Sequence, residues 1–209
     1  MASEQVHFSS PALGEILRRG IPIQFFSWSG QFLGNFLPAQ NSHGLARLQQ
    51  YRRTLDPAFA LQMAGRMVTA KLYNQRRVLQ RLGASRDQTQ ESRASREAPD
   101  GEALDSRPSP LDSTLKWLDS LFASLRTSRS IDELRGYEGA STARYFQVWA
   151  GFLPAEFPFE RRSTRPPLNP VNACISFGST LLYNEIMALT HAHGLDPALN
   201  TLHATTDGR

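Results

Sequence analysis

Helical periodicity between residues 56 and 82 constrains the fold of this chain more than any other feature of its sequence. Apolar side chains recur there every three or four residues, which is the spacing of one face of an α-helix. Those side chains are Leu61, Ala64, Val68, Leu72, Leu79 and Leu82. Asp56 and Pro57 precede them, and proline fits the first turn of a helix. We therefore expect a long helix from Asp56 to about Leu82, within a pattern that is helical from Leu45 onward.

The first 40 residues show a different pattern, with short apolar and aromatic runs separated by turn residues. We predict strands at 5–9, 21–28 and 31–37, the last two joined as a hairpin through Ser29 and Gly30. A short helix at 11–19, with Ser10 as its N-cap, lies between the first two strands. Because so few strands cannot bury a sheet by themselves, this segment is interpreted as part of a larger β domain.

Three more helical segments follow residue 83. Ser109 and Pro110 begin an amphipathic helix with the apolar stripe Leu111, Leu115, Leu118, Phe122 and Leu125. Residues 130–152 hold one or two helices, and 153–168 form a loop rich in Pro, Phe and Arg. Asn169 and Pro170 start a helix that Gly194 ends. Its apolar residues point nearly all round, so we expect it to be the central buried helix.

The predicted fold class is α+β, with a small, partial N-terminal β domain followed by a larger all-α domain. The predicted division is 1–40 for the β domain, 41–83 for the first helices and 111–209 for the remaining helical domain. Residues 84–110 are mainly Ser, Arg, Glu, Asp, Gln, Pro and Ala with almost no large apolar side chain, which indicates a flexible linker or insert.

Composition excludes some classes of protein and favours others weakly. The chain has 23 Lys and Arg against 19 Asp and Glu, an excess that only modestly favours a polyanionic partner. Its single cysteine, Cys174, rules out an intrachain disulfide and a cysteine metal cluster. The N-terminus has neither a basic segment nor an apolar core, and no apolar run is long enough for a membrane span. We therefore expect a cytoplasmic protein with no membrane partner.

Glu138 and His203 are the side chains with the clearest alternative roles. Glu138 lies between two glycines, near the expected start of a helix. There it is either a carboxylate that stabilises the helix dipole, or a metal ligand or general base that the glycines allow a partner to approach. His203 lies in the C-terminal tail, where a lone histidine is more often structural than ligating.

The loop containing Arg161, Arg162 and Arg165 is the strongest local sign of nucleic-acid binding. Guanidinium groups bind phosphates through paired hydrogen bonds, and the neighbouring Phe157 and Phe159 offer faces on which unpaired bases stack. A proline-rich connector with solvated arginines explains the same residues equally well.

Five segments together resemble the CRISPR adaptation integrase family. They are LRRGIPIQFFS at 17–27, KLYNQR at 71–76, GYEGASTARYF at 136–146, RSTRPPLNPVNA at 162–173, and GLDP at 194–197 followed by Leu-His at 202–203. None is decisive alone, but their order and coverage are similar to the family pattern over most of the chain. Ser179, where the family has tyrosine, and Asn200-Thr201, where it has Gly-Phe, depart from that pattern.

The resemblance implies a homodimer with a β-sandwich-like domain and an all-helical catalytic domain. It also implies that Glu138 and His203 match two of three metal ligands, for Mg²⁺ or Mn²⁺. The third ligand in the family is an acidic residue soon after the histidine. Asp207 is near but does not match it, so the resemblance implies a chain truncated at its C-terminus, and also at its N-terminus.

The resemblance further implies a metal-dependent DNA endonuclease and integrase of spacer acquisition, an antiviral defence. Such proteins join the 3′-hydroxyls of double-stranded prespacer DNA to CRISPR repeat DNA, together with a small second adaptation subunit. The candidates for DNA contact are Arg161, Arg162, Arg165, Arg144 and Lys71. With one ligand unmatched, we expect weak or no nuclease activity from the chain as printed. The alternatives are a catalytically incomplete fragment that binds DNA and dimerises, or a product with no stable fold.

Overall fold

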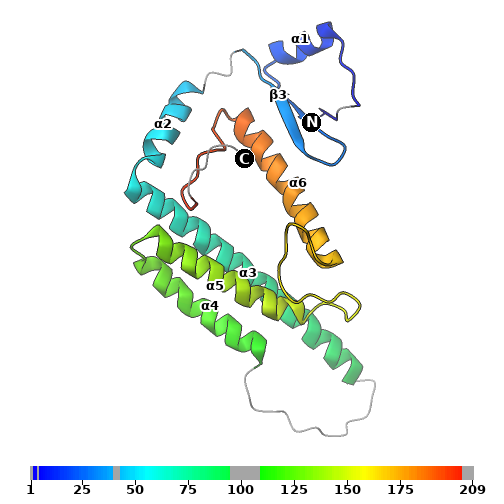
Figure 1. Ribbon diagram of the computed structural model, residues 1–209, viewed down its shortest axis with the longest axis vertical. Helices are drawn as coiled ribbons and strands as arrows, with labels where there is room; N and C mark the ends of the chain where they lie inside the picture. Colours follow the sequence, from blue (N-terminus) through cyan, green and yellow to red (C-terminus); the bar gives the residue numbers. More distant parts are fainter. Residues whose placement is uncertain (1, 4, 40–42, 95–108, 204–209) are drawn as a thin grey trace. The chain divides into compact units, whose positions relative to one another are not determined.

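The computed structural model describes residues 2–3, 5–39, 43–94 and 109–203 (Figure 1). Those residues form six helices and three short strands, so the chain is mostly helical with a small N-terminal sheet, and the predicted α+β class is confirmed. The elements are β1 (Ala2–Ser3), α1 (Ser10–Arg18), β2 (Ile23–Phe26), β3 (Phe32–Phe36), α2 (Gly44–Thr54), α3 (Pro57–Ala94), α4 (Pro110–Thr127), α5 (Ile131–Ala150) and α6 (Pro170–Ala192). No described helix has the length and apolar character needed to cross a membrane.

Two compact units make up the chain. The first unit combines Met1–Ala60 with Thr164–Arg209, and the second unit is Leu61–Ser163. These units cut across the predicted segments 1–40, 41–83, 84–110 and 111–209, because α6 returns to the N-terminal sheet and packs on β3.

The sheet of the first unit has the strand order β1-β2-β3. β2 pairs antiparallel with β3 through a turn in which Gly30 has a φ of 81°, so the predicted hairpin is confirmed with shorter strands. The predicted strand at 5–9 is wrong, since the described strand before α1 is Ala2–Ser3. Ser9 instead caps α1 by accepting a hydrogen bond from the backbone N of Ala12, so the predicted cap at Ser10 is displaced by one residue.

Helix α6 has the predicted ends but not the predicted burial. Asn169 caps it by accepting a hydrogen bond from the backbone N of Asn172 at 2.8 Å, and Gly194 follows it with a φ of 69°. Phe177 and Leu182 are each 59% exposed, so the expectation of a fully buried helix is wrong for the described structure.

The exposure of α6 follows from the small size of the sheet that covers it. Gln24 of β2 donates to the backbone O of Ala188 at 2.7 Å, and the Phe32 ring stacks on His191. A Cβ added at Gly30 would lie 2.2 Å from Leu181 Cδ2, so the turn also approaches α6 closely. The hairpin of β2 and β3 therefore covers one strip of α6, along Leu181, Ala188 and His191.

Helix α3 is longer than its sequence pattern predicts. It begins where expected, with Asp56 accepting a hydrogen bond from the backbone N of Ala58, but it continues to Ala94. Residues 84–94 contain no Pro or Gly, and polar residues such as Gln, Arg and Glu are good helix formers. The first part of the predicted linker is therefore helix, and residues 95–108 lie outside the described residues.

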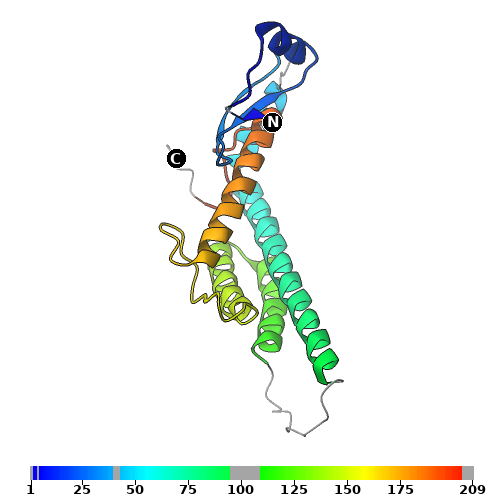
Figure 2. The same ribbon diagram turned by 90° about the vertical axis from the view of Figure 1, so that its right-hand side faces the viewer.

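The second unit packs α3, α4 and α5 alongside one another (Figure 2). Its core takes the predicted stripe of α3, of which Ala64, Val68, Leu72 and Leu79 are buried. The α4 stripe is confirmed at Leu118 and Leu125, but Leu121 is buried where Phe122 was expected. Residues 131–150 form one continuous helix, α5, with Ser130 as its N-cap and Leu134 in the core.

We expect Leu72→Ala to lower the free energy of unfolding by about 2–5 kcal/mol, because Leu72 is fully buried and truncation leaves a cavity. Urea unfolding followed by circular dichroism measures the change. Met67→Ala is the matched control on the same helix, since Met67 is 51% exposed. Equal losses in the two variants would contradict this assignment of the core.

Candidate functional site

Glu138 lies in the interior of α5, on the side that meets α3. The first turn of α5 is occupied by Asp132 and Glu133 instead. The interpretation of Glu138 as a carboxylate that stabilises the helix dipole is therefore wrong, because that effect fades beyond the first turn. Its carboxylate oxygen Oε1 forms an ion pair with the ammonium of Lys71, which comes from α3.

A second pair of side chains joins the same two helices one turn further along. Gln75 donates from Nε2 to Thr142 Oγ1 at 3.3 Å, and the Thr142 hydroxyl donates to the backbone O of Glu138 at 2.7 Å. Gln75 is only 8% exposed, and its Oε1 has no partner among the described residues. Lys71 and Gln75 thus present one face of α3 to Glu138 and Thr142 on α5.

The Gln75–Thr142 pair lies at the wall of a cavity of about 640 Å³. Its other lining residues include Lys71, Asn74, Tyr145 and Phe146. Burial raises the pKa of the Tyr145 phenol above its ordinary value, because a partly buried site disfavours the charged phenolate. The sequence analysis assigned no role to Gln75 or Tyr145. For Gln75 a signal was available, because residues 71 and 75 are one helical turn apart and so lie on one face of α3, the face that meets α5.

His203 belongs to the first unit, in a tail that α2 holds in place. Gln50 of α2 makes two hydrogen bonds of 2.8 Å to Asp196, one to its backbone O from Nε2 and one from its backbone N to Oε1. The Asp196 carboxylate accepts a hydrogen bond from the backbone N of Ala198 at 2.9 Å. The Gln50 side chain therefore holds the start of the tail by pairing with both the backbone N and the backbone O of Asp196, as a neighbouring β-strand would.

The departure from the family pattern at Asn200 has a structural use. Asn200 Oδ1 accepts a hydrogen bond from the backbone N of His203 at 2.8 Å, which closes a local turn and leaves the imidazole exposed. Glu138 and His203 belong to different units, so their convergence on one cation stays a prediction. The described part of the chain contains no group of three or more His, Cys, Asp or Glu side chains arranged to hold a metal ion.

The arginine loop lies between α5 and α6, and its residues differ in environment. Arg161 and Arg165 are exposed, while Arg162 is half-buried and donates to the backbone O of Ser163 at 2.5 Å. The peptide bond between Arg165 and Pro166 is cis.

The two phenylalanines of this loop also differ. Phe159 is buried, with its ring 5.3 Å from that of Trp149 and 5.5 Å from that of Phe146. The hypothesis that Phe159 stacks on unpaired bases is therefore wrong, because its ring is used in the core. Phe157 is 49% exposed, and its stacking on unpaired bases stays a prediction.

Arg144 braces α5 against α4. Its Nε donates to Thr114 Oγ1 at 3.0 Å, and its Cζ lies 4.9 Å from the centroid of the Trp117 ring. Thr114 is 1% exposed, so the acceptor is fixed in position. The contact of Arg144 with DNA stays a prediction. One face of its guanidinium already packs on the Trp117 ring.

Comparison with known proteins decides the family. The family model for CRISPR associated protein Cas1 matches residues 1–209. The chain belongs to the Cas1 family. It is 30% identical to the CRISPR-associated endonuclease Cas1 of Mycobacterium tuberculosis, over 96% of this chain and 52% of that protein. It is 33% identical to a Cas4 exonuclease/Cas1 endonuclease fusion of Geobacter sulfurreducens, over 96% of this chain and 34% of the fusion.

The fold agrees with that of solved Cas1 chains. A chain of a partial Cas6-RT-Cas1–Cas2 complex superposes with a TM-score of 0.72 and 26% identity, covering 95% of this chain and 54% of that one. The chain thus spans about half the length of the M. tuberculosis Cas1 and of the solved chain. The resemblance predicted from the five sequence segments is confirmed, and two of those segments meet at the Lys71–Glu138 pair.

We expect Gln50→Ala to release the Cas1 tail that carries His203, because both of its hydrogen bonds to Asp196 are lost. Backbone amide exchange at Asp196 should accelerate by roughly tenfold, the factor that corresponds to about 1.4 kcal/mol of local stability. Hydrogen–deuterium exchange with peptide mapping over 194–203 measures this change. Gln49→Ala is the matched control, since Gln49 is an exposed neighbour on the same helix. Unchanged exchange in Gln50→Ala would show that the Gln50 side chain does not hold the tail.

Proposed function

We propose that this Cas1-family chain contributes the catalytic helical part of a metal-dependent DNA endonuclease and integrase of CRISPR adaptation. In this role it joins the 3′-hydroxyl ends of a prespacer to the CRISPR repeat. The observation that carries the proposal is the half-buried Glu138 carboxylate of α5, which already pairs with a cation, the Lys71 ammonium of α3. The relatives named above are called endonucleases, which supports the same reaction class.

The chemistry of Glu138 fits a divalent metal ion. Its side chain is 23% exposed, and it already holds one positive charge, from Lys71, on Oε1. Carboxylate and imidazole together suit Mn²⁺ and tolerate Mg²⁺, so we propose Glu138 and His203 as two ligands of such an ion. When bound, the ion would supply charge neutralisation on the scissile phosphate and activation of the attacking hydroxyl.

The residues around Glu138 orient its carboxylate rather than react. Phosphoryl transfer needs positioning and charge stabilisation more than covalent participation by the protein. The Lys71 ammonium and an incoming metal ion would compete for one carboxylate. Lys71 can form an ion pair with either of two anions, Glu138 or a DNA phosphate. Its side chain is 41% exposed and has several rotatable bonds, so the ammonium can move between them.

The arginine loop supplies the proposed DNA contacts. Arg161, Arg165 and Phe157 are all exposed, and they lie within nine consecutive residues of the sequence. Guanidinium groups bind the phosphate backbone without regard to sequence, which suits a protein that must accept many different spacers. The proposed ligands are double-stranded prespacer DNA and the CRISPR repeat.

The proposed assembly is a homodimer with a small second adaptation subunit, in the prokaryotic cytoplasm. The solved relative belongs to a Cas6-RT-Cas1–Cas2 complex, which supports Cas2 as the second subunit.

A second candidate function is a DNA-binding, dimerising module without catalysis. It is favoured by the lack of any three-residue His, Cys, Asp or Glu cluster within the described ranges. The two candidates differ in cleavage and agree in DNA binding.

We expect Glu138→Ala to weaken Mn²⁺ binding at least about tenfold, because loss of a charged ligand oxygen costs more than loss of a supporting residue. Electron paramagnetic resonance of free Mn²⁺ measures binding without any need for activity. Glu160→Ala is the matched control, since Glu160 is an exposed carboxylate in the same unit.

Cleavage of branched DNA by wild type and by Glu138→Ala separates the two candidate functions. Mn²⁺-dependent cleavage that Glu138→Ala abolishes supports the enzyme. Glu138-dependent Mn²⁺ binding without cleavage supports the non-catalytic module. Mn²⁺ binding that is identical in wild type and Glu138→Ala removes Glu138 from the metal site.

We expect Arg165→Ala to weaken binding to all duplex sequences alike and to lower the slope of log affinity against log salt by about one unit. The reason is that one phosphate contact, with its released counterion, is lost. Fluorescence anisotropy with a labelled duplex at several salt concentrations measures the slope. Arg126→Ala is the control, because Arg126 is exposed in the last turn of α4. A slope that stays constant in Arg165→Ala argues against this contact.

A further inference from the structure

We propose that Gln75 is a positioning residue of the metal site, because its carboxamide oxygen accepts the Lys71 ammonium when a divalent cation binds the Glu138 carboxylate. This inference rests on the proposed function, in which Glu138 is a metal ligand. The three side chains come from α3 and α5 and belong to the second unit. Lys71 thus has a second acceptor within the protein, and Glu138 can exchange one cation for another.

Gln75 carries a buried acceptor that no described group uses. The residue is 8% exposed, and its Oε1 is almost out of contact with solvent and has no hydrogen-bond partner among the described residues. Buried oxygens without a partner are uncommon in folded proteins, because burial removes the hydrogen bonds that water would make. This oxygen is therefore available to a donor that reaches it from a neighbouring side chain.

The hydrogen bonds of Thr142 decide which end of the carboxamide is unpaired. The Thr142 hydroxyl donates to the backbone O of Glu138 at 2.7 Å, and a hydroxyl has only one proton to donate. Its Oγ1 can then only accept from Gln75, whose Nε2 lies 3.3 Å away. Turning the carboxamide over would place two acceptors against each other. The oxygen, and not the amide nitrogen, is thus the end without a partner.

Lys71 is the donor best placed to reach this oxygen. It lies one helical turn before Gln75 on α3, and side chains four residues apart are neighbours on a helix surface. Both residues line the cavity of about 640 Å³, and the Lys71 ammonium moves through several rotatable bonds. Tyr145 also lines this cavity, but its hydroxyl moves only with its ring, whose centroid lies 5.2 Å from that of Phe146.

The exchange of cations at Glu138 explains what a second acceptor contributes. The carboxylate pairs with Lys71 in the described structure, and a divalent ion on the same carboxylate would repel the ammonium. The Gln75 oxygen can hold the displaced ammonium by a charge-assisted hydrogen bond without adding a charge of its own. Gln75 therefore makes Lys71 easier to displace, and in this way raises the affinity of Glu138 for the metal ion.

A double-mutant cycle with Gln75→Leu and Lys71→Met tests this role. Leucine removes the acceptor at similar size, and methionine removes the ammonium but keeps much of the stem. We expect Gln75→Leu to weaken Mn²⁺ binding by about tenfold, the effect typical of residues that support a metal ligand. In the Lys71→Met background the same substitution should change the affinity by less than about twofold, because no ammonium remains to be held.

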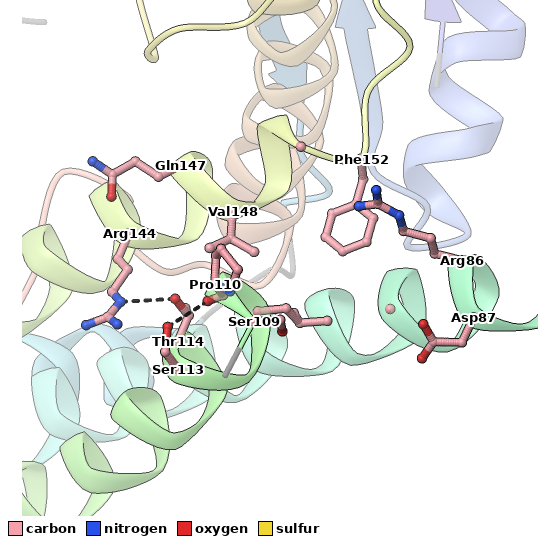
Figure 3. Close-up of a pocket in the computed structure, with 13 residues that line it drawn as sticks. Arg86, Asp87, Ser109, Pro110, Ser113, Thr114, Arg144, Gln147, Val148 and Phe152 are labelled. Carbon is pink, nitrogen blue, oxygen red and sulfur yellow. Dashed lines mark hydrogen bonds between the residues drawn. The ribbon is translucent and has the colours of Figure 1, made fainter. Parts of the chain in front are cut away.

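Electron paramagnetic resonance of free Mn²⁺ measures the affinity of each variant, and a thermal melt checks its folding. Gln75→Met takes the place of Gln75→Leu if the leucine variant does not fold. Gln147→Leu is the matched control, since it makes the same change at an exposed position of α5. Gln147 lines the other cavity, of about 820 Å³, whose lining includes neither Lys71 nor Glu138 (Figure 3). Its variant should bind Mn²⁺ as wild type does.

The outcomes separate this inference from the proposed function. Equal losses for Gln75→Leu in both backgrounds would mean that Gln75 only holds α3 against α5, and no loss in either would mean that it has no role at the metal site. Each of these results overturns the positioning role while Glu138→Ala, measured alongside, still weakens Mn²⁺ binding. If Glu138→Ala binds Mn²⁺ as tightly as wild type, the metal site and this inference are both wrong.

Discussion

The packing of α3 against α5 is the contact on which the candidate chemistry of the second unit depends. The apolar stripe of α3 sets the rotation of that helix, because Val68, Leu72 and Leu79 must face the core. Once they do, Lys71 and Gln75 can only lie on the adjoining face, which meets Glu138 and Thr142. Burial of the leucines supplies the energy for this arrangement. The ion pair contributes little by comparison, since the Lys71 side chain is 41% exposed and water screens its charge.

Much of the fold follows from local signals in the sequence. Caps and glycines mark the ends of helices by their own hydrogen bonds and dihedral angles, so Asn169, Ser130, Ser109 and Gly194 occur where those rules place them. The end of α3 could not be predicted in this way. Residues 84–94 lack an apolar stripe, but periodicity reports only which face is buried, and a helix can continue into solvent beyond its last core contact. Glu138 was placed in a first turn for a related reason, since the flanking glycines resembled a break that the helix does not make.

The candidate site was only partly accessible from sequence, because its supporting contacts join distant residues. Gln50 and Asp196 are separated by 146 positions, and Lys71 and Glu138 by 67. No period or local motif connects such pairs, so Gln50 carried no signal of its own. Gln75 and Tyr145 lie in segments that resemble the family, but those segments do not say which side chains meet in space. The resemblance to a family identified Glu138 and His203 as residues of interest, but not the side chains that hold them. Asn200 illustrates the difference. In the sequence it is only a departure from the family pattern, whereas in the structure its carboxamide oxygen accepts a hydrogen bond from the His203 backbone N.

The arginines show why net charge is a poor guide to where an anion binds. A formal charge of +4 is modest for 209 residues, and several basic side chains of the described structure are already paired with nearby carboxylates. Arg76 is paired with Asp119 and Lys71 with Glu138, so neither adds a full positive charge to its surroundings. Arg144 differs, since its described partners are a hydroxyl and an aromatic ring, and both orient a guanidinium without neutralising it. A cation oriented by neutral partners retains its attraction for an external anion and has already lost the rotamer freedom that binding would otherwise cost. The environment of each arginine, rather than the number of arginines, therefore determines where this chain carries a positive charge that no carboxylate neutralises.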